Sequence, residues 1–225
     1  MSKQKSPKNV TVYGRLSFPS WTPAEAYALS LKGSYPDASE AESVPHFNLV
    51  LDQAQFDKVK KHAEEVFLPY CAEQTKAGEK KDALKPGEVK QLIDTINGDL
   101  DAQTLNTPFK VVSEKTADLV PDGVAVVKAM GSRGTAIQQF AIVNDEDELA
   151  VPDPDILSFP LVKPINETNH TMYPGCYVSA TLNLYAYRNG KHPGFSAGAN
   201  AAVFKMDGES FSGGTAIDFD EIFVD

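Results

Sequence analysis

The most constraining feature of this sequence is a strand-like alternation that begins at Cys176. The even positions from Cys176 to Ala186 are all apolar, whereas the odd positions from Tyr177 to Tyr187 are polar or tyrosine. Successive side chains of a β-strand point to opposite faces of a sheet. The pattern therefore predicts a strand with one face in the core and one outer face that carries tyrosines.

This strand is predicted to form a long hairpin over residues 176–204. Asn189-Gly190 is the strongest short-range hairpin signal, and a second strand is predicted over residues 195–204. Arg188 and Lys191 flank the turn, so the hairpin has a basic tip.

Charge is segregated along the chain, although the net charge is −10. Three segments, residues 1–24, 123–144 and 168–206, hold nine of the 21 Lys and Arg residues and no Asp or Glu. A polyanion senses charge within about 8 to 10 Å at ordinary salt, so local charge matters more than the total. The scarcity of acids in strands is an alternative explanation for part of this pattern.

Size and composition indicate a globular chain. The 225 residues are 42% hydrophobic and 23% charged, enough to bury a core. No apolar run approaches the roughly 18 residues of a membrane helix, so no membrane partner is expected. Residues 1–8 do not resemble a secretory signal. Cys71 and Cys176 are expected to be reduced and buried, as in a cytoplasmic protein.

A first strand is predicted over residues 10–18, with Tyr13 and Arg15 on its polar face. The prolines at positions 19 and 23 predict a loop that presents Trp21. That tryptophan either stacks on a ligand or plugs one end of the core.

A strand-helix unit follows, with the strand over residues 47–51. Asp52 is a predicted N-cap, with Gln55 placed as in a capping box, and the apolar stripe of the helix includes Val66. Residues 73–107 read as an insertion with a helix over residues 87–97.

Two further β-rich runs, residues 123–130 and 135–143, predict a second hairpin with Arg133 at its tip. Arg133 is well placed for phosphate. Lys128 lies among apolar neighbours and either snorkels to solvent or binds a ligand.

Signals for catalysis are weak. The four histidines have no metal-ligand spacing, and no P-loop, Gly-x-Ser-x-Gly elbow or dinucleotide fingerprint is present. Asp153 and Asp155 could hold magnesium in a nuclease, but an exposed acidic loop explains them better. We predict no cofactor, no metal and no enzymatic activity.

Tyrosine-bearing strand faces with basic neighbours are typical of surfaces that bind single-stranded nucleic acid. Bases stack on aromatic rings at about 1 to 3 kcal/mol each, and cations neutralise the backbone. Two alternatives remain open: the tyrosines only pair across strands, or they contact protein or glycan in a β-rich virion or adhesin-like module.

Several motifs resemble those of a tailed-phage family of single-stranded-DNA-binding proteins. They are Val12-Tyr13-Gly14-Arg15-Leu16-Ser17-Phe18, Tyr173-Pro174-Gly175-Cys176-Tyr177-Val178, Leu184-Tyr185-Ala186-Tyr187 and Gly194-Phe195-Ser196-Ala197-Gly198. The resemblance is strongest over residues 171–214 and poor over residues 73–107.

The resemblance implies an all-β-dominated fold, an oligonucleotide-binding (OB) fold-like Greek-key β-barrel with extra hairpins and one or two inserted helices. It implies single-stranded DNA as partner, in phage DNA replication and recombination, within the cytoplasm of the infected bacterial host. We expect one domain over residues 1–206 and an acidic C-terminal tail over residues 207–225. Homo-oligomerisation is left open.

The tail alternates acids with aromatics, which favours a peptide for replication or recombination proteins. A solubility tail, or a DNA mimic that folds back on the basic groove, are alternatives. The predicted partner-binding residues are Asp218, Phe219, Asp220, Glu221 and Phe223. The predicted DNA-binding residues are Tyr13, Arg15, Trp21, Lys128, Arg133, Tyr177, Tyr185, Tyr187, Arg188, Lys191 and Phe195.

Overall fold

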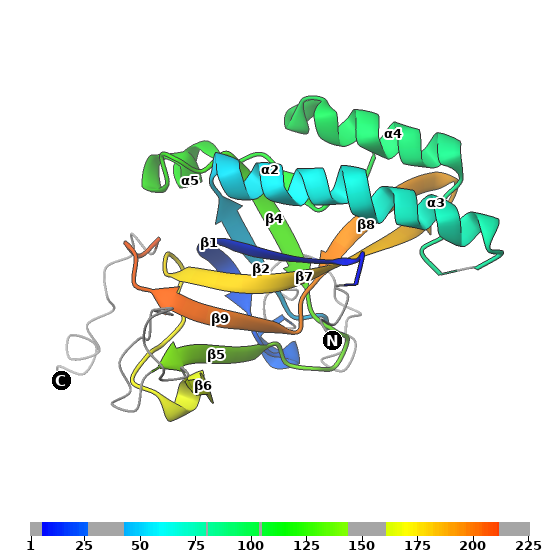
Figure 1. The fold of residues 1–225 in the computed structure, drawn as a ribbon. Helices are drawn as coiled ribbons and strands as arrows, with labels where there is room; N and C mark the ends of the chain where they lie inside the picture. Colours follow the sequence, from blue (N-terminus) through cyan, green and yellow to red (C-terminus); the bar gives the residue numbers. More distant parts are fainter. Residues whose placement is uncertain (1–5, 27–42, 80, 104, 144–160, 212–225) are drawn as a thin grey trace, which may run out of the picture.

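A computed structural model describes residues 6–26, 43–79, 81–103, 105–143 and 161–211 (Figure 1). Its strands are β1 (Asn9–Ser20), β2 (His46–Leu51), β3 (Phe109–Lys110), β4 (Ala125–Met130), β5 (Gln138–Val143), β6 (Leu161–Pro164), β7 (Tyr177–Asn189), β8 (His192–Gly198) and β9 (Ala201–Met206). Its helices are α2 (Gln53–His62), α3 (Leu68–Lys76), α4 (Pro86–Asn97) and α5 (Glu114–Leu119).

Five strands close into a barrel. β1 pairs with both β2 and β7, and the pairs β2–β4, β4–β8 and β8–β7 complete the circuit. All of these pairs are antiparallel except β4–β8. This five-stranded closure, with helices inserted between strands, confirms the predicted OB-fold-like class.

β1 closes the barrel because its two halves pair with different strands. Asn9 to Arg15 pair with β7, and Arg15 to Ser20 pair with β2. Gly14 lies at the crossing, where an added Cβ would come within 2.6 Å of the Val50 carbonyl oxygen. Only glycine lets the strands approach this closely without displacement.

The alternation in β7 is confirmed. Its even residues from Val178 to Leu184 are buried, and the hairpin turn at Asn189-Gly190 is present, with a φ of 62° at Gly190. The predicted partner strand over residues 195–204 is wrong as a single element. It divides into β8, which pairs with the second half of β7, and β9, which pairs with the first half.

The predicted hairpin between residues 123–130 and 135–143 is also wrong. β4 joins the barrel, whereas β5 pairs with β9 and β6. Both runs have strand character, but the turn between them redirects the chain instead of pairing its two arms. In Figure 1, β9, β5 and β6 lie together on the side of the barrel opposite the helices.

The helices cover the other side of the barrel (Figure 1). Asp52 caps α2 as predicted, because its carboxylate accepts the Gln55 N–H at 2.8 Å. The Gln55 side chain does not complete a capping box; it accepts the N–H of Tyr13 on β1 at 3.1 Å. α2 is thereby attached to the edge of the barrel.

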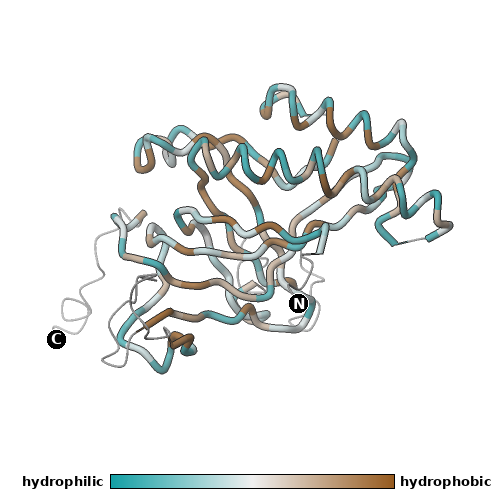
Figure 2. The backbone as a smooth tube through the Cα atoms, in the orientation of Figure 1, coloured by the Kyte–Doolittle hydropathy of each residue, from teal (hydrophilic) through white to brown (hydrophobic). Residues whose placement is uncertain are grey.

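A π-helical turn, Ala63–Phe67, joins α2 to α3 and shifts the apolar stripe. Val59, Ala63 and Phe67 are buried as predicted, but Val66 is 40% exposed. The extra residue of a π-helical turn rotates the following side chains around the axis. In Figure 2, hydrophilic and hydrophobic residues alternate along these helices, as expected for elements with one buried stripe.

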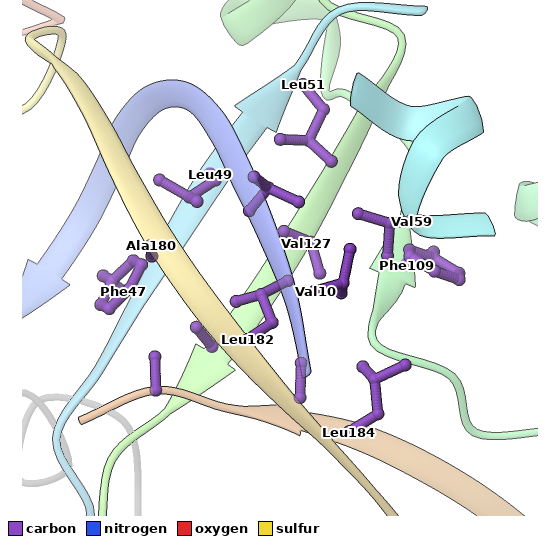
Figure 3. Packing of buried hydrophobic residues seen from close by; sticks show 14 of the residues in the cluster. Val10, Phe47, Leu49, Leu51, Val59, Phe109, Val127, Ala180, Leu182 and Leu184 are labelled. Carbon is purple, nitrogen blue, oxygen red and sulfur yellow. The ribbon is translucent and has the colours of Figure 1, made fainter. Parts of the chain in front are cut away.

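The core fills the interior of the barrel and continues to the helices that cover it (Figure 3). Phe109 and Phe195 pack edge to face with ring centroids 6.0 Å apart, and Phe67 contacts Phe195 from the helical layer. Both cysteines are free and buried, as predicted. Burial raises the pKa of the Cys71 thiol to about 12, so it stays protonated at neutral pH.

Candidate nucleic-acid interface

The outer face of β7 forms a polar surface across the barrel. Thr181 faces Thr11 of β1 with hydroxyl oxygens 2.9 Å apart, and the Asn183 amide donates to Asn9 Oδ1 at 2.7 Å. These pairs retain unused donors and acceptors, because each hydroxyl or amide can make more than one hydrogen bond. The surface can therefore hydrogen-bond a polar ligand.

A groove of about 680 Å³ crosses this face, and we call it the β7 groove. Its lining residues are Asn9, Thr11, Met130, Gly131, Ser132, Ile142, Ser179, Ala180, Thr181, Asn183, Tyr185, Gly198, Ala199, Asn200, Ala201, Val203 and Lys205.

Every lining residue comes from one of the three acid-free segments of the sequence. β1, the turn after β4 and the β7–β8–β9 region meet here because barrel closure places β7 between β1 and β8. Among the described residues, the groove is lined by one cation, Lys205, and by no carboxylate. An anionic ligand would meet no repulsion from its walls.

Tyr185 is the predicted tyrosine that lines the groove. Its ring lies beside Gly198, where an added Cβ would sit 3.7 Å from the ring. Tyr187 lies next to Tyr185, with ring centroids 6.3 Å apart, and covers Gly194 of the paired strand. Both rings are half-buried, so they pack across the strands and also retain accessible surface.

Tyr13 and Tyr177 form a separate aromatic pair on the same face. Their rings stack at 5.5 Å with an interplanar angle of 13°. Burial, followed by the neighbouring Tyr177 and the Asp52 carboxylate, raises the pKa of Tyr13. This pair lies near an acid and does not line the β7 groove.

The Arg15 side chain, a predicted DNA-binding group, is buried and hydrogen-bonded within the protein. It is 8% exposed, and its guanidinium donates to the carbonyls of Gly175 at 2.9 Å, Leu119 at 3.1 Å and Glu209. The Phe211 ring lies over the guanidinium, with 4.7 Å between Arg15 Cζ and the ring centroid. Carbonyl acceptors already occupy the donors that a phosphate would need, so Arg15 holds the chain that follows β9 against the barrel.

Trp21 and Phe195 belong to the core. Trp21 is 8% exposed and packs on Phe47, and Phe195 is fully buried between Phe67 and Phe109. Neither ring has a face free for a base. We therefore correct their assignment from ligand stacking to packing; Trp21 is the plug of the alternative interpretation.

The predicted cations lie in different settings. Arg188 forms a two-bond ion pair with Glu88 of α4, at 2.7 and 3.1 Å, so its charge is already balanced. Lys191 is exposed at the hairpin tip, and Arg133 is exposed and directly follows the groove residue Ser132 in the chain. These two side chains are accessible to phosphate.

Lys128 lies on the outer face of β4, one pleat from the groove residue Met130. Burial and then the neighbouring Lys110 lower its pKa. Its charge in turn adds to burial in lowering the pKa of His46 on the adjacent strand. Lys128 is half-buried, as expected of a snorkelling lysine at the margin of the groove.

Sequence reasoning did not select Lys205, Thr11, Thr181 or Asn183 as site residues. Lys205 could have been found from the third acid-free segment. The polar residues carry no sequence signal, because Thr and Asn are unremarkable on any solvated strand face. The predicted tail residues at positions 218–223, and Asp153 and Asp155, lie outside the described residues.

Within the described ranges, no cluster of three or more His, Cys, Asp or Glu side chains is arranged to hold a metal ion. None of the described helices has the length and apolarity needed to cross a bilayer.

Comparisons with solved structures return phage proteins. The single-stranded DNA-binding protein from bacteriophage Enc34 is 15% identical with a TM-score of 0.47, and the alignment covers 96% of this chain and 90% of that chain. The same protein in complex with ssDNA is 14% identical, with a TM-score of 0.49 and coverages of 93% and 97%. The gp2.5 single-stranded DNA binding protein of bacteriophage T7 is 13% identical, with a TM-score of 0.40 and coverages of 95% and 97%. All three TM-scores lie below 0.5, so the fold class rests on the strand pairing of this chain.

No curated protein matches the chain. The family model of the Enterobacter phage Enc34 ssDNA-binding protein matches residues 149–223. That segment contains β7, β8 and β9, which form most of the β7 groove. The family match over residues 149–223 therefore confirms the resemblance to phage single-stranded-DNA-binding proteins that the sequence motifs indicated.

Proposed function

We propose that this protein binds single-stranded DNA in the β7 groove with little sequence preference. The observation that carries the proposal is the convergence of three acid-free segments on one groove that contains Tyr185 and Lys205. The name of the matching family supports the same ligand.

In this proposal Tyr185 stacks on a base, and Lys205 and Arg133 neutralise phosphates. Stacking is worth about 1 to 3 kcal/mol per base and tolerates any base, because every base has a π face. The hydroxyls and amides of Thr181 and Asn183 hydrogen-bond the strand without a fixed pattern of base edges. Affinity then comes from stacking and charge, which explains a low sequence preference.

The wider role that we propose is protection of single strands during phage DNA replication and recombination in the cytoplasm of the infected bacterium. The protein acts by binding and not by catalysis. Residues 1–206 form the binding domain, with residues 73–107 as an insertion. The acidic tail over residues 207–225 contacts partner proteins through its alternating acids and aromatics.

The direct test is fluorescence anisotropy with end-labelled oligo-dT of about 16 nucleotides, the upper end of site sizes for one OB-fold. Binding should weaken as salt rises, because phosphate contacts release counterions with a slope of about −0.7 per contact for single strands. Single-stranded oligonucleotides of mixed sequence should bind with similar affinity.

The Lys205→Gln/Arg133→Gln variant should reduce the magnitude of the salt slope by about 1.4, that is 0.7 for each of two contacts. Lys76→Gln/Lys90→Gln is the matched control, because it removes two charges from exposed sites on α3 and α4. Absent binding, or binding that ignores salt, contradicts the proposal and favours the virion or adhesin-like alternative.

A further inference from the structure

A second groove, of about 600 Å³, lies beside the β7 groove, and we call it the α2 groove. Asn9, Thr11 and Thr181 line both grooves. The two are therefore separated only by the ridge that these three side chains form. On the far side of the ridge, the α2 groove is lined by Lys58, Lys61, His62, Glu65 and Val66 of the helical layer.

The position of α2 beside this ridge is fixed by specific contacts. The His62 ring lies 2.9 Å from the Pro7 carbonyl, which holds the start of the described chain against the helix. At the other end of α2, Gln55 accepts the Tyr13 N–H. Both ends of α2 are thus attached to β1 or the residues before it, and the groove between them has a defined shape.

Lys58 and Lys61 are the cations of the α2 groove, and their charges are available. Lys58 is exposed, and its ammonium group has no hydrogen bond or ion pair within the described part of the chain. Lys61 pairs with Glu65 only at 3.9 Å, with side chains 72% and 62% exposed. An exposed pair at this distance is worth less than about 1 kcal/mol, so a phosphate can replace it.

Val66 adds an apolar surface to the same groove, because the π-helical turn leaves it 40% exposed. A groove with accessible cations and an exposed apolar side chain suits a sugar-phosphate chain, which presents anionic groups and apolar sugar and base faces. Unlike the β7 groove, the α2 groove also contains a carboxylate, Glu65, but its two lysines outnumber this single acid.

We propose that single-stranded DNA continues from the β7 groove across Thr11 and Thr181 into the α2 groove, where Lys58 and Lys61 bind its phosphates. This inference rests on the proposed function. It assigns a binding role to two lysines on the exposed side of α2. The path crosses β1 and β7 instead of following the length of β7.

The test compares two oligo-dT lengths, about 4 and about 16 nucleotides, which are the limits of OB-fold site sizes. The variant is Lys58→Gln/Lys61→Gln, and the control is again Lys76→Gln/Lys90→Gln, which removes the same total charge. For the longer oligonucleotide, the variant should bind more weakly than the control, and the magnitude of its salt slope should fall by about 1.4. For the shorter one, which fits the β7 groove alone, variant and control should bind equally.

The outcomes separate this inference from the proposed function. Suppose that the unmodified protein and the control bind both oligonucleotides, and that Lys58→Gln/Lys61→Gln binds the longer one with the same affinity as the control. The extended path is then wrong, and binding in the β7 groove remains supported. An equal loss on both lengths also overturns the inference, because it would place these lysines in the primary site. If the unmodified protein binds neither oligonucleotide, the proposed function itself fails.

Discussion

Arg15 and Tyr185 both have side chains that suit nucleic acid, but their surroundings give them different roles. Arg15 is 8% exposed and donates to three backbone carbonyls, whereas Tyr185 lines an acid-free groove. The residue type determines which interactions a side chain can make. Its environment decides whether that interaction is already satisfied inside the protein.

Replacing Tyr185 with Ala should weaken oligo-dT binding by about 1 to 3 kcal/mol, because it removes one stacked base. Tyr13→Ala is the matched control, since Tyr13 stacks on Tyr177 outside the groove. Tyr185→Phe retains the ring and should bind like the unmodified protein. Anisotropy titration measures all three variants, and an equal loss for Tyr13→Ala and Tyr185→Ala would contradict the assignment.

Asp82 is a third residue whose role depends on its surroundings. It is 6% exposed, accepts the Ala186 N–H at 3.0 Å, and pairs with the Lys8 ammonium at 2.6 Å. Its φ of 57° lies in the left-handed region that Asp and Asn tolerate better than most residues. One carboxylate therefore links three separate segments of the chain.

Asp82→Ala should lower the free energy of unfolding by about 3 to 5 kcal/mol, because it leaves the Lys8 ammonium without its partner. Asp82→Asn keeps the backbone conformation and an acceptor for Ala186, so it should cost less. Urea unfolding measures both. Lys90→Gln is the control: it breaks only the exposed pair with Asp94, so its effect on the free energy of unfolding should stay within about 0.5 kcal/mol. An equally small effect of Asp82→Ala would refute a structural role for the buried Lys8–Asp82 pair.

At the scale of elements, β7 organises the molecule because it pairs with three other strands. Its first half pairs with β1 and β9, and its second half pairs with β8. The far end of the β7–β8 hairpin reaches α4 through the Arg188–Glu88 ion pair (Figure 1). This pair connects the hairpin tip to the helical layer.

The Arg188–Glu88 pair should make stability depend on pH. The hydrogen bond from Arg188 lowers the pKa of Glu88 below its usual 4.5. A lowered folded-state pKa stabilises the fold above the unfolded value, and this contribution is lost as pH falls through the folded value. Glu88→Gln should therefore be less stable at pH 7, by less than about 1 kcal/mol because the Arg188 side chain is 41% exposed and solvent screens the pair.

Urea unfolding of Glu88→Gln and the unmodified protein between neutral pH and about pH 3 checks this expectation. The difference between the two proteins should shrink as pH falls below the usual Glu range. A difference that is constant over the whole range would show that the charge of Glu88 does not contribute. Asp94→Asn is the control, since the Lys90–Asp94 pair lies within one exposed helix face.

At the scale of the whole molecule, barrel closure creates the β7 groove. Closure brings β1, the turn after β4 and the β7–β8–β9 region to one surface, although they come from three distant parts of the chain. Gly14 is the position where this closure is tightest, because β1 there changes partner from β7 to β2.

Gly14→Ala should destabilise the protein by about 1 to 3 kcal/mol, as expected for overpacking at a rigid contact. Its Cβ would meet the Val50 carbonyl at 2.6 Å and a Leu51 methyl at 2.9 Å. Gly87→Ala is the matched control, since nothing lies within 4 Å of its added Cβ. In the first turn of α4, alanine should be neutral or slightly stabilising. Thermal unfolding measures both, and equal melting temperatures would show that the crossing can relax.

Several features could be predicted from local sequence because their physical causes are local. The alternation of β7, the Asn189-Gly190 turn, the Asp52 cap and the helix ending at Asn97 each depend on neighbouring residues. The exposure of Val66 was missed because a π-helical turn has no clear sequence signal.

What the sequence by itself determined is which residues of a strand share a face, where the main hairpin turns, and that acids are absent from three segments. Only the tertiary structure decided which strands pair, and hence that these three segments meet in one groove. It also decided that Phe195, Trp21 and Arg15 are buried and do not line that groove. The physical reason is that side-chain alternation follows from the geometry of one strand. Pairing depends on closing the whole barrel, which couples residues far apart in the sequence.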